Sequence, residues 1–75
     1  MIRLSMLEGK KIKLVNKNGR TFEGVVGDYI YPEDNAPEEV EAIVLDHPIR
    51  DDGFKYENPV EFTAPEIESI VIKEF

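Results

Sequence analysis

Apolar and polar residues alternate along most of the chain with a period of two, which is typical of β-strands. The longest such stretch runs from Gly19 to Tyr31. One of its faces carries Phe22, Val26 and Ile30, and the other carries Val25, Tyr29 and Tyr31. Gly24 and Gly27 interrupt it, and glycine inside a strand favours a bulge or sharp coiling. We therefore predict one long strand that bends over a small core.

Four other segments have the same strand pattern: Lys10–Val15, Val40–Asp46, Phe54–Thr63 and Ser69–Glu74. In the first, Ile12 and Leu14 are expected to face the core. In the third, Phe54, Tyr56, Val60 and Phe62 share the core-facing parity. Pro59 interrupts that segment and is expected at a bulge or an edge, because proline has no N–H to donate.

The connections between these segments carry turn signals. Asn16–Gly19 predicts a hairpin turn, since Asn and Gly tolerate positive φ. Pro32–Glu39 and His47–Gly53 are predicted to be loops. Ala64–Glu68 is too short for a helix and predicts a single 3₁₀ turn before the last strand.

Together these elements predict an all-β fold: a small, strongly bent, five-stranded antiparallel barrel of the SH3/Sm-like type. At this length residues 1–75 are expected to form a single domain. No helix longer than two turns is expected. The predicted core is Phe22, Val26, Ile43, Leu45, Phe62, Ile70 and Ile72.

Charge is distributed unevenly along the chain, whose net charge is −7. Residues 1–27 carry six basic and two acidic side chains, whereas residues 28–75 carry three basic and fourteen acidic ones. There is no cysteine, which excludes disulfides and thiolate metal sites. No apolar run approaches a membrane span, and the first residues lack the apolar segment of a signal peptide, so we expect a cytoplasmic protein with no membrane contact.

Several stretches resemble the Sm/LSm-like family of small five-stranded barrels between Gly9 and Lys73. They are Gly9–Leu14, Asn18-Gly19 with Phe22–Val26, Ile43–Asp46 and Glu66–Ile72. The resemblance implies a binding protein, because members of this family typically form rings of six or seven subunits and bind RNA. The family's Asp-x-aromatic-x-Asn loop is replaced here by Tyr31–Asn35, and its Arg-Gly loop by Thr63–Glu66. We therefore carry over the fold and not the RNA pocket.

Catalytic and metal-binding chemistry find little support in the sequence. His47 is the single histidine and has neither a cysteine nor a suitably placed nucleophile nearby, so it is interpreted as a surface residue. Asp46, Asp51, Asp52 and Glu57 lack the spacing of a calcium loop. We expect no enzyme activity, no cofactor and no metal.

Two binding hypotheses remain. Phosphate contacts from a basic hairpin would give RNA binding, and the residues concerned are Lys11, Lys13, Lys17 and Arg20. Tyr29, Tyr31, Phe54 and Tyr56 would stack on bases if exposed, although Phe54 and Tyr56 have core parity. Alternatively, the protein docks a basic protein partner through an acidic loop that contains Glu33, Asp34, Glu38 and Glu39.

The protein-binding hypothesis is favoured, because the net charge opposes a polyanionic ligand. Acidic Sm-like proteins that bind an RNA-handling protein, such as the inhibitor of the termination factor Rho, provide a parallel within the resemblance. A monomer or small homo-oligomer is expected, since Pro59 interrupts a strand that subunit pairing in the family's rings requires.

Overall fold

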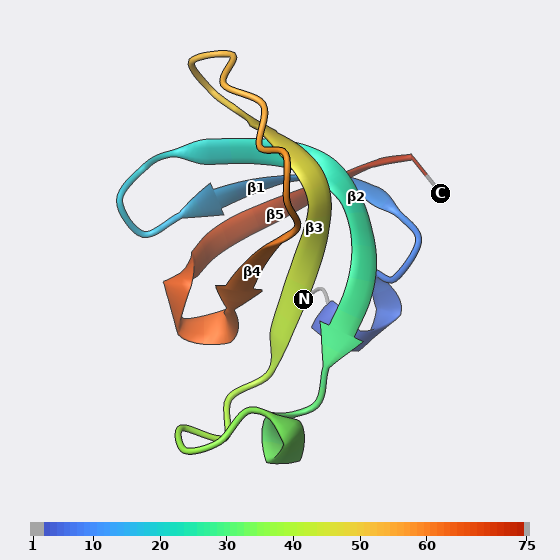
Figure 1. The fold of residues 1–75 in the computed structure, drawn as a ribbon, viewed down its shortest axis with the longest axis vertical. Helices are drawn as coiled ribbons and strands as arrows, with labels where there is room; N and C mark the ends of the chain where they lie inside the picture. The colour runs from blue at the N-terminus through green and yellow to red at the C-terminus, as the bar shows by residue number, and fades with distance from the viewer. Residues whose placement is uncertain (1–2, 75) are drawn as a thin grey trace.

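Five antiparallel strands form one strongly bent sheet in the computed structural model, which describes residues 3–74 (Figure 1). The strands are β1 (Lys11–Asn16), β2 (Thr21–Ile30), β3 (Ala42–Arg50), β4 (Val60–Thr63) and β5 (Ile67–Glu74). Their order in the sheet is β4-β3-β2-β1-β5. Within the described residues the edge strands β4 and β5 each pair on one side only, so the sheet curls without closing. The predicted all-β class and strand number are confirmed.

Three short 3₁₀ turns complete the fold: η1 (Leu4–Met6), η2 (Pro32–Asp34) and η3 (Ala64–Glu66). The last of these is the turn predicted before the final strand. It is held by the Glu66 carboxylate, which accepts hydrogen bonds from the Thr63 N–H at 3.1 Å and from the Thr63 hydroxyl at 2.6 Å. The described residues contain no longer helix, as predicted.

The predicted hairpin joins β1 to β2. Leu14 lies opposite Phe22 in the register. Two backbone N–H groups, those of Asn18 and Arg20, donate to the Asn16 side-chain oxygen at 3.0 and 2.9 Å. Gly19 has a φ of +85°, a left-handed conformation that glycine adopts at little cost. The Asn-Gly signal therefore predicted this turn for the right physical reason.

Strand β2 bends at both of its glycines. The register with β3 shifts between Glu23 and Val25 and again between Val26 and Asp28. A Cβ at Gly27 would meet the exposed Asp46 carboxylate, which would have to move to admit a side chain. Beyond Gly27, Tyr29 lies opposite buried Ile43 and packs against the core. The predicted alternation, which put Tyr29 on the face away from Phe22 and Val26, is therefore wrong past Gly27, because a bulge reverses the parity.

Strand β3 is longer than predicted. The sequence predicts a loop from His47 onward, but β3 continues to Arg50, which pairs with Phe22. His47 has a φ of +44°, and the next residue, Pro48, is buried. The register shift on β2 provides a bulge here, so a proline fits inside the strand without breaking the ladder.

The fourth strand, by contrast, is shorter than predicted. Strand β4 begins at Val60, directly after Pro59, and residues 51–59 form a loop. Phe54, predicted to face the core, is 52% exposed, and Tyr56 is half-buried. Apart from one bridge between Ile49 and Lys55, this segment has no ladder to fix its alternation.

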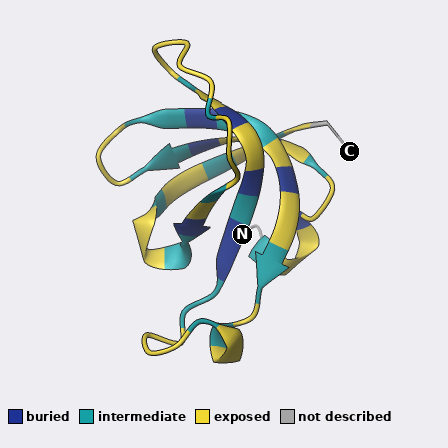
Figure 2. Cartoon of the chain, in the orientation of Figure 1, coloured by how far each residue is buried: buried dark blue, intermediate teal, exposed yellow. Residues whose placement is uncertain are grey.

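The buried residues are spread over all the strands of the sheet except β5, the edge strand next to β1 (Figure 2). The core consists of Leu7, Ile12, Leu14, Phe22, Val26, Ile43, Leu45 and Phe62. Five of the seven predicted residues are among these. Ile70 and Ile72 are only half-buried, because β5 is an edge strand. Leu7, which follows η1, was not predicted and is 1% exposed.

We expect Phe22→Ala to destabilise the fold severely. The Phe22 ring packs against Phe62, with ring centroids 4.9 Å apart, and against Tyr56 at 6.1 Å. Its removal should cost about 3–5 kcal/mol, which is comparable with the whole stability of so small a domain. Urea unfolding measures this loss. Val71→Thr is the control, because Val71 is 57% exposed and its variant should unfold like the wild type. Equal midpoints for all three proteins would contradict the core assignment.

Candidate functional site

The predicted basic residues lie on β1 and on the hairpin turn that follows it. Lys11 and Lys13 project from the outer face of β1, since they alternate with buried Ile12 and Leu14. Lys13 lies between Glu23 of β2 and Val71 of β5 in the register, so an acidic and an apolar residue flank it. The Glu23 carboxylate therefore partly offsets the positive charge on this face of β1.

The other two basic residues are engaged by carboxylates. Lys17 at the hairpin forms an ion pair with Glu68 at 3.1 Å. Arg20 contacts Asp51 at 3.0 Å and Asp52 at 3.2 Å. These pairs are solvent-exposed and individually weak. Nevertheless, each places a negative charge beside a cation that a phosphate would have to reach.

The predicted acidic residues lie together on the loop between β2 and β3. Glu33 and Asp34 belong to η2, and Glu38 and Glu39 follow it; all four are exposed. None of the four forms an ion pair with another side chain of the described part of the chain. The structure therefore leaves their charge uncompensated.

Asn35 fixes the shape of this acidic loop. Its side-chain amide donates to the Val40 carbonyl at 2.9 Å, and its own carbonyl accepts the Glu39 N–H at 2.9 Å. Asn35 also reaches the Glu61 carboxylate of β4, at 3.4 Å. These hydrogen bonds hold the carboxylates of the loop in a defined arrangement. An ordered surface of this kind loses less conformational entropy on binding.

A tyrosine pair stands at the base of the acidic loop. The Tyr29 hydroxyl donates to the Glu41 carboxylate at 2.8 Å, and this hydrogen bond raises the pKa of Tyr29. The Tyr31 ring packs edge-on against Tyr29, with centroids 5.0 Å apart, and is 56% exposed. The aromatic pair adds apolar area beside the negative charge.

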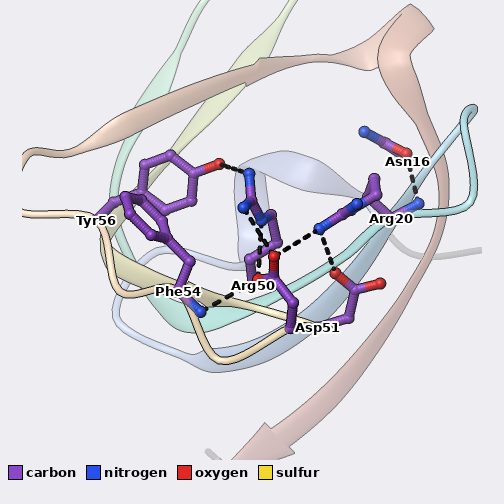
Figure 3. Close-up of polar contacts among 7 residues, drawn as sticks. Asn16, Arg20, Arg50, Asp51, Phe54 and Tyr56 are labelled. Carbon is purple, nitrogen blue, oxygen red and sulfur yellow. Dashed lines mark hydrogen bonds and ion pairs between the residues drawn. The ribbon is translucent and has the colours of Figure 1, made fainter.

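A second cluster, centred on Arg50, was missed by sequence reasoning (Figure 3). The Arg50 guanidinium donates to both carboxylate oxygens of Asp52, at 3.0 and 2.8 Å, and to the Tyr56 hydroxyl at 3.3 Å. It also lies 5.0 Å from the centroid of the Phe54 ring. The signal was present in the sequence as Arg50-Asp51-Asp52-Gly53, because a turn brings residues two apart within reach of a bidentate pair.

This cluster shifts the titration of its members. The hydrogen bonds from Arg50 and the one from the Phe54 N–H hold the pKa of Asp52 well below its ordinary range. The Asp52 carboxylate in turn raises the pKa of Arg50. Arg20 adds a smaller favourable charge interaction with Asp52. The cluster therefore connects the hairpin turn before β2, the end of β3 and the loop that follows β3.

The remaining candidates are placed as follows. His47 is exposed on β3. Among the described residues there is no group of three or more His, Cys, Asp or Glu side chains arranged to hold a metal ion. Nor does any helix in residues 3–74 have the length and apolarity needed to cross a membrane.

One solved structure is similar to this chain over nearly its whole length. It is the crystal structure of a novel Sm-like archaeal protein from Pyrobaculum aerophilum, with a TM-score of 0.70 and 26% sequence identity. The similarity covers 96% of this chain and 49% of that chain, so the present chain spans about half of it. No protein-family model and no curated protein sequence matches.

The fold is therefore Sm-like, as the sequence resemblance implied. A small β fold of this kind suggests a binding module.

The Arg50–Asp52 contact should make stability depend on acid pH. A depressed pKa means that the folded state releases the Asp52 proton more readily, so the stabilisation is present above the ordinary pKa of 3.8 and is lost as pH falls below it. Asp52→Asn should lower the thermal midpoint at neutral pH and match the wild type more closely in acid. Asp34→Asn, at an unpaired carboxylate of the described chain, should show no such convergence. A wild-type advantage over Asp52→Asn that is constant with pH would contradict the role of this ion pair.

Proposed function

We propose that this protein is a small, non-enzymatic binding module that docks onto a basic protein partner through its acidic loop. The observation that carries the proposal is the contrast between the two predicted sites. The acidic loop keeps four exposed carboxylates without internal counter-charges, namely Glu33, Asp34, Glu38 and Glu39. Two of the four cations in the basic set are already paired.

Electrostatics on the scale of the whole molecule supports the same choice. With a net charge of −7, the chain attracts cationic surfaces and repels phosphate backbones. The exposed ring of Tyr31 beside the loop offers an additional surface on which an arginine or lysine of the partner packs. A docking site of this composition gains mainly in association rate and specificity.

The test compares two variants with charge changes of equal size. One neutralises the loop with Glu33→Gln, Asp34→Asn, Glu38→Gln and Glu39→Gln; the other reverses the strand charges with Lys11→Glu and Lys13→Glu. With an arginine- and lysine-rich peptide as the probe, loop neutralisation should slow association about ten-fold or more at low salt. The Lys11/Lys13 variant should bind that peptide at least as fast as the wild type. Stopped-flow or biosensor kinetics measure the rates.

The opposite pattern would contradict the proposal. RNA binding at physiological salt that is abolished by Lys11→Glu with Lys13→Glu, in a protein that stays folded, would support the basic hairpin instead. Capture from a cell lysate with and without nuclease separates a direct protein contact from one bridged by RNA. A cytoplasmic location remains a prediction of the sequence.

The expected assembly is a monomer or a small homo-oligomer. Strand β4 has only four residues and is preceded by Pro59, so it offers a short edge for pairing with another subunit. The unpaired negative charge of the acidic loop adds repulsion between copies. Sedimentation velocity should therefore show a small species, and a stable hexamer or heptamer would overturn this expectation.

A further inference from the structure

The hairpin turn between β1 and β2 contains an asparagine followed by a glycine, and neither binding hypothesis uses these two residues (Figure 1). Asn18 and Gly19 are both exposed. Because glycine has no side chain, its backbone nitrogen is open to close approach by the residue before it. Asparagine is among the thermolabile residues, since its side-chain amide can be lost by cyclisation onto that nitrogen. The turn therefore holds a chemically reactive pair.

The side-chain amide of Asn18 is free to move toward this nitrogen. Within residues 3–74 no hydrogen bond holds it. A Cβ at Gly19 would have no described atom within 4 Å beyond its chain neighbours, so the space beside the Gly19 backbone is open. The amide carbon of Asn18 can therefore reach the Gly19 nitrogen once the turn opens.

The other three asparagines of the chain are protected, each in a different way. The side-chain oxygen of Asn16 accepts two backbone N–H groups. The amide of Asn35 donates to a backbone carbonyl at 2.9 Å. Asn58 precedes Pro59, which has no N–H and cannot act as the nucleophile. Asn18 is the asparagine whose surroundings permit the reaction.

We propose that Asn18 is a site of spontaneous covalent modification, at which the side-chain amide is lost through a cyclic imide. The Gly19 nitrogen gives up its proton to solvent and forms a bond to Cγ of Asn18. The bond from Cγ to Nδ2 breaks, and the nitrogen leaves as ammonia after taking up a proton from solvent. Water then opens the imide at either of its two carbonyls. Opening at Cγ leaves aspartate, and opening at the main-chain carbonyl leaves isoaspartate.

The closed turn restrains this reaction. The Gly19 N–H, whose nitrogen is the nucleophile, donates to the Asn16 carbonyl at 3.0 Å. The Asn16 side-chain oxygen adds two hydrogen bonds, from the N–H groups of Asn18 and Arg20. Since the nucleophile is released only when the turn opens, the rate in the folded protein follows that local opening. Asn16 therefore both builds the turn and protects Asn18.

The two products act differently on the hairpin. Aspartate makes the net charge one unit more negative than −7, beside Lys17, which already pairs with Glu68 at 3.1 Å. Isoaspartate also lengthens the main chain of the turn by a methylene group. The hydrogen bonds from Gly19 and Arg20 to Asn16 then lose their geometry. This product should therefore weaken the turn that sets the register of β1 on β2.

The test follows the purified protein during incubation in mildly alkaline buffer, with peptide mapping by mass spectrometry. We expect loss of amide at Asn18 first, as two products of equal mass that separate on chromatography. Asn18→Gln should resist, because its longer side chain would have to close a larger ring. Asn16→Ala should raise the rate about ten-fold, since it removes two hydrogen bonds that hold the turn closed. Asn16→Asp keeps an accepting oxygen and should react like the wild type.

Unfolding in urea provides the control for the role of the turn. Wild type, Asn16→Ala and Asn16→Asp should there lose the Asn18 amide at one common rate, faster than the folded wild type. First loss at another asparagine, or none at Asn18 in the folded protein, would overturn the proposal. Equal rates for folded and unfolded wild type would do the same, as would equal rates for wild type and a folded Asn16→Ala. The purified isoaspartate form should also melt at a lower temperature than Asn18→Asp, and equal melting would contradict its effect on the turn.

Discussion

The double bend of β2 is the constraint on which the rest of the fold depends. This strand pairs with β1 on one side and with β3 on the other. If it were straight, five short strands would form a flat sheet with too little concave surface to enclose a core. The register shifts beside Gly24 and Gly27 increase the local twist and curl both neighbours with the strand. A side chain at Gly27 would displace the exposed Asp46 carboxylate, so the two strands lie close together at this bulge.

The same bend separates two surfaces of different composition. Strand β3 follows the curve of β2, with the acidic loop before its first residue, Ala42, and the Arg50 cluster at its last. The carboxylate-rich acidic loop and the aromatic residues Phe54 and Tyr56 therefore lie near opposite ends of one strand. A small domain with a net charge of −7 can thus present two surfaces of different chemistry.

The sequence predicted those elements whose signals are local. The Asn16–Gly19 turn, the alternation of Ile12 and Leu14 with lysines, and the 3₁₀ turn after Thr63 all depend on residues a few positions apart. The failures have a non-local cause. Tyr29 changed face because of a bulge whose effect on parity depends on the partner strand, and Pro48 sits inside a strand because that bulge makes room for it.

The candidate sites show the same difference between features with a local cause and features with a non-local cause. Exposure of the acidic loop followed from its prolines and charges, which are local features. The pairing of Arg20 was not predictable in this way, because Asp51 and Asp52 reach it from a distant segment of the sequence. Phe54 was assigned to the core from alternation alone, and alternation is informative only where a ladder enforces it. Without a strand at residues 54–59, the ring was free to turn outward.

Tyr56 connects the loop between β3 and β4 to the core of the domain. Its ring touches Phe22 in the core and Phe54 at the surface, and its hydroxyl accepts from Arg50. The loop between β3 and β4 lacks a ladder of its own, so these contacts and the Arg50–Asp52 pair determine its position. The position of Phe54 therefore depends indirectly on the packing of Phe22. The acidic loop, by contrast, is held by the hydrogen bond from the Asn35 amide to the Val40 carbonyl.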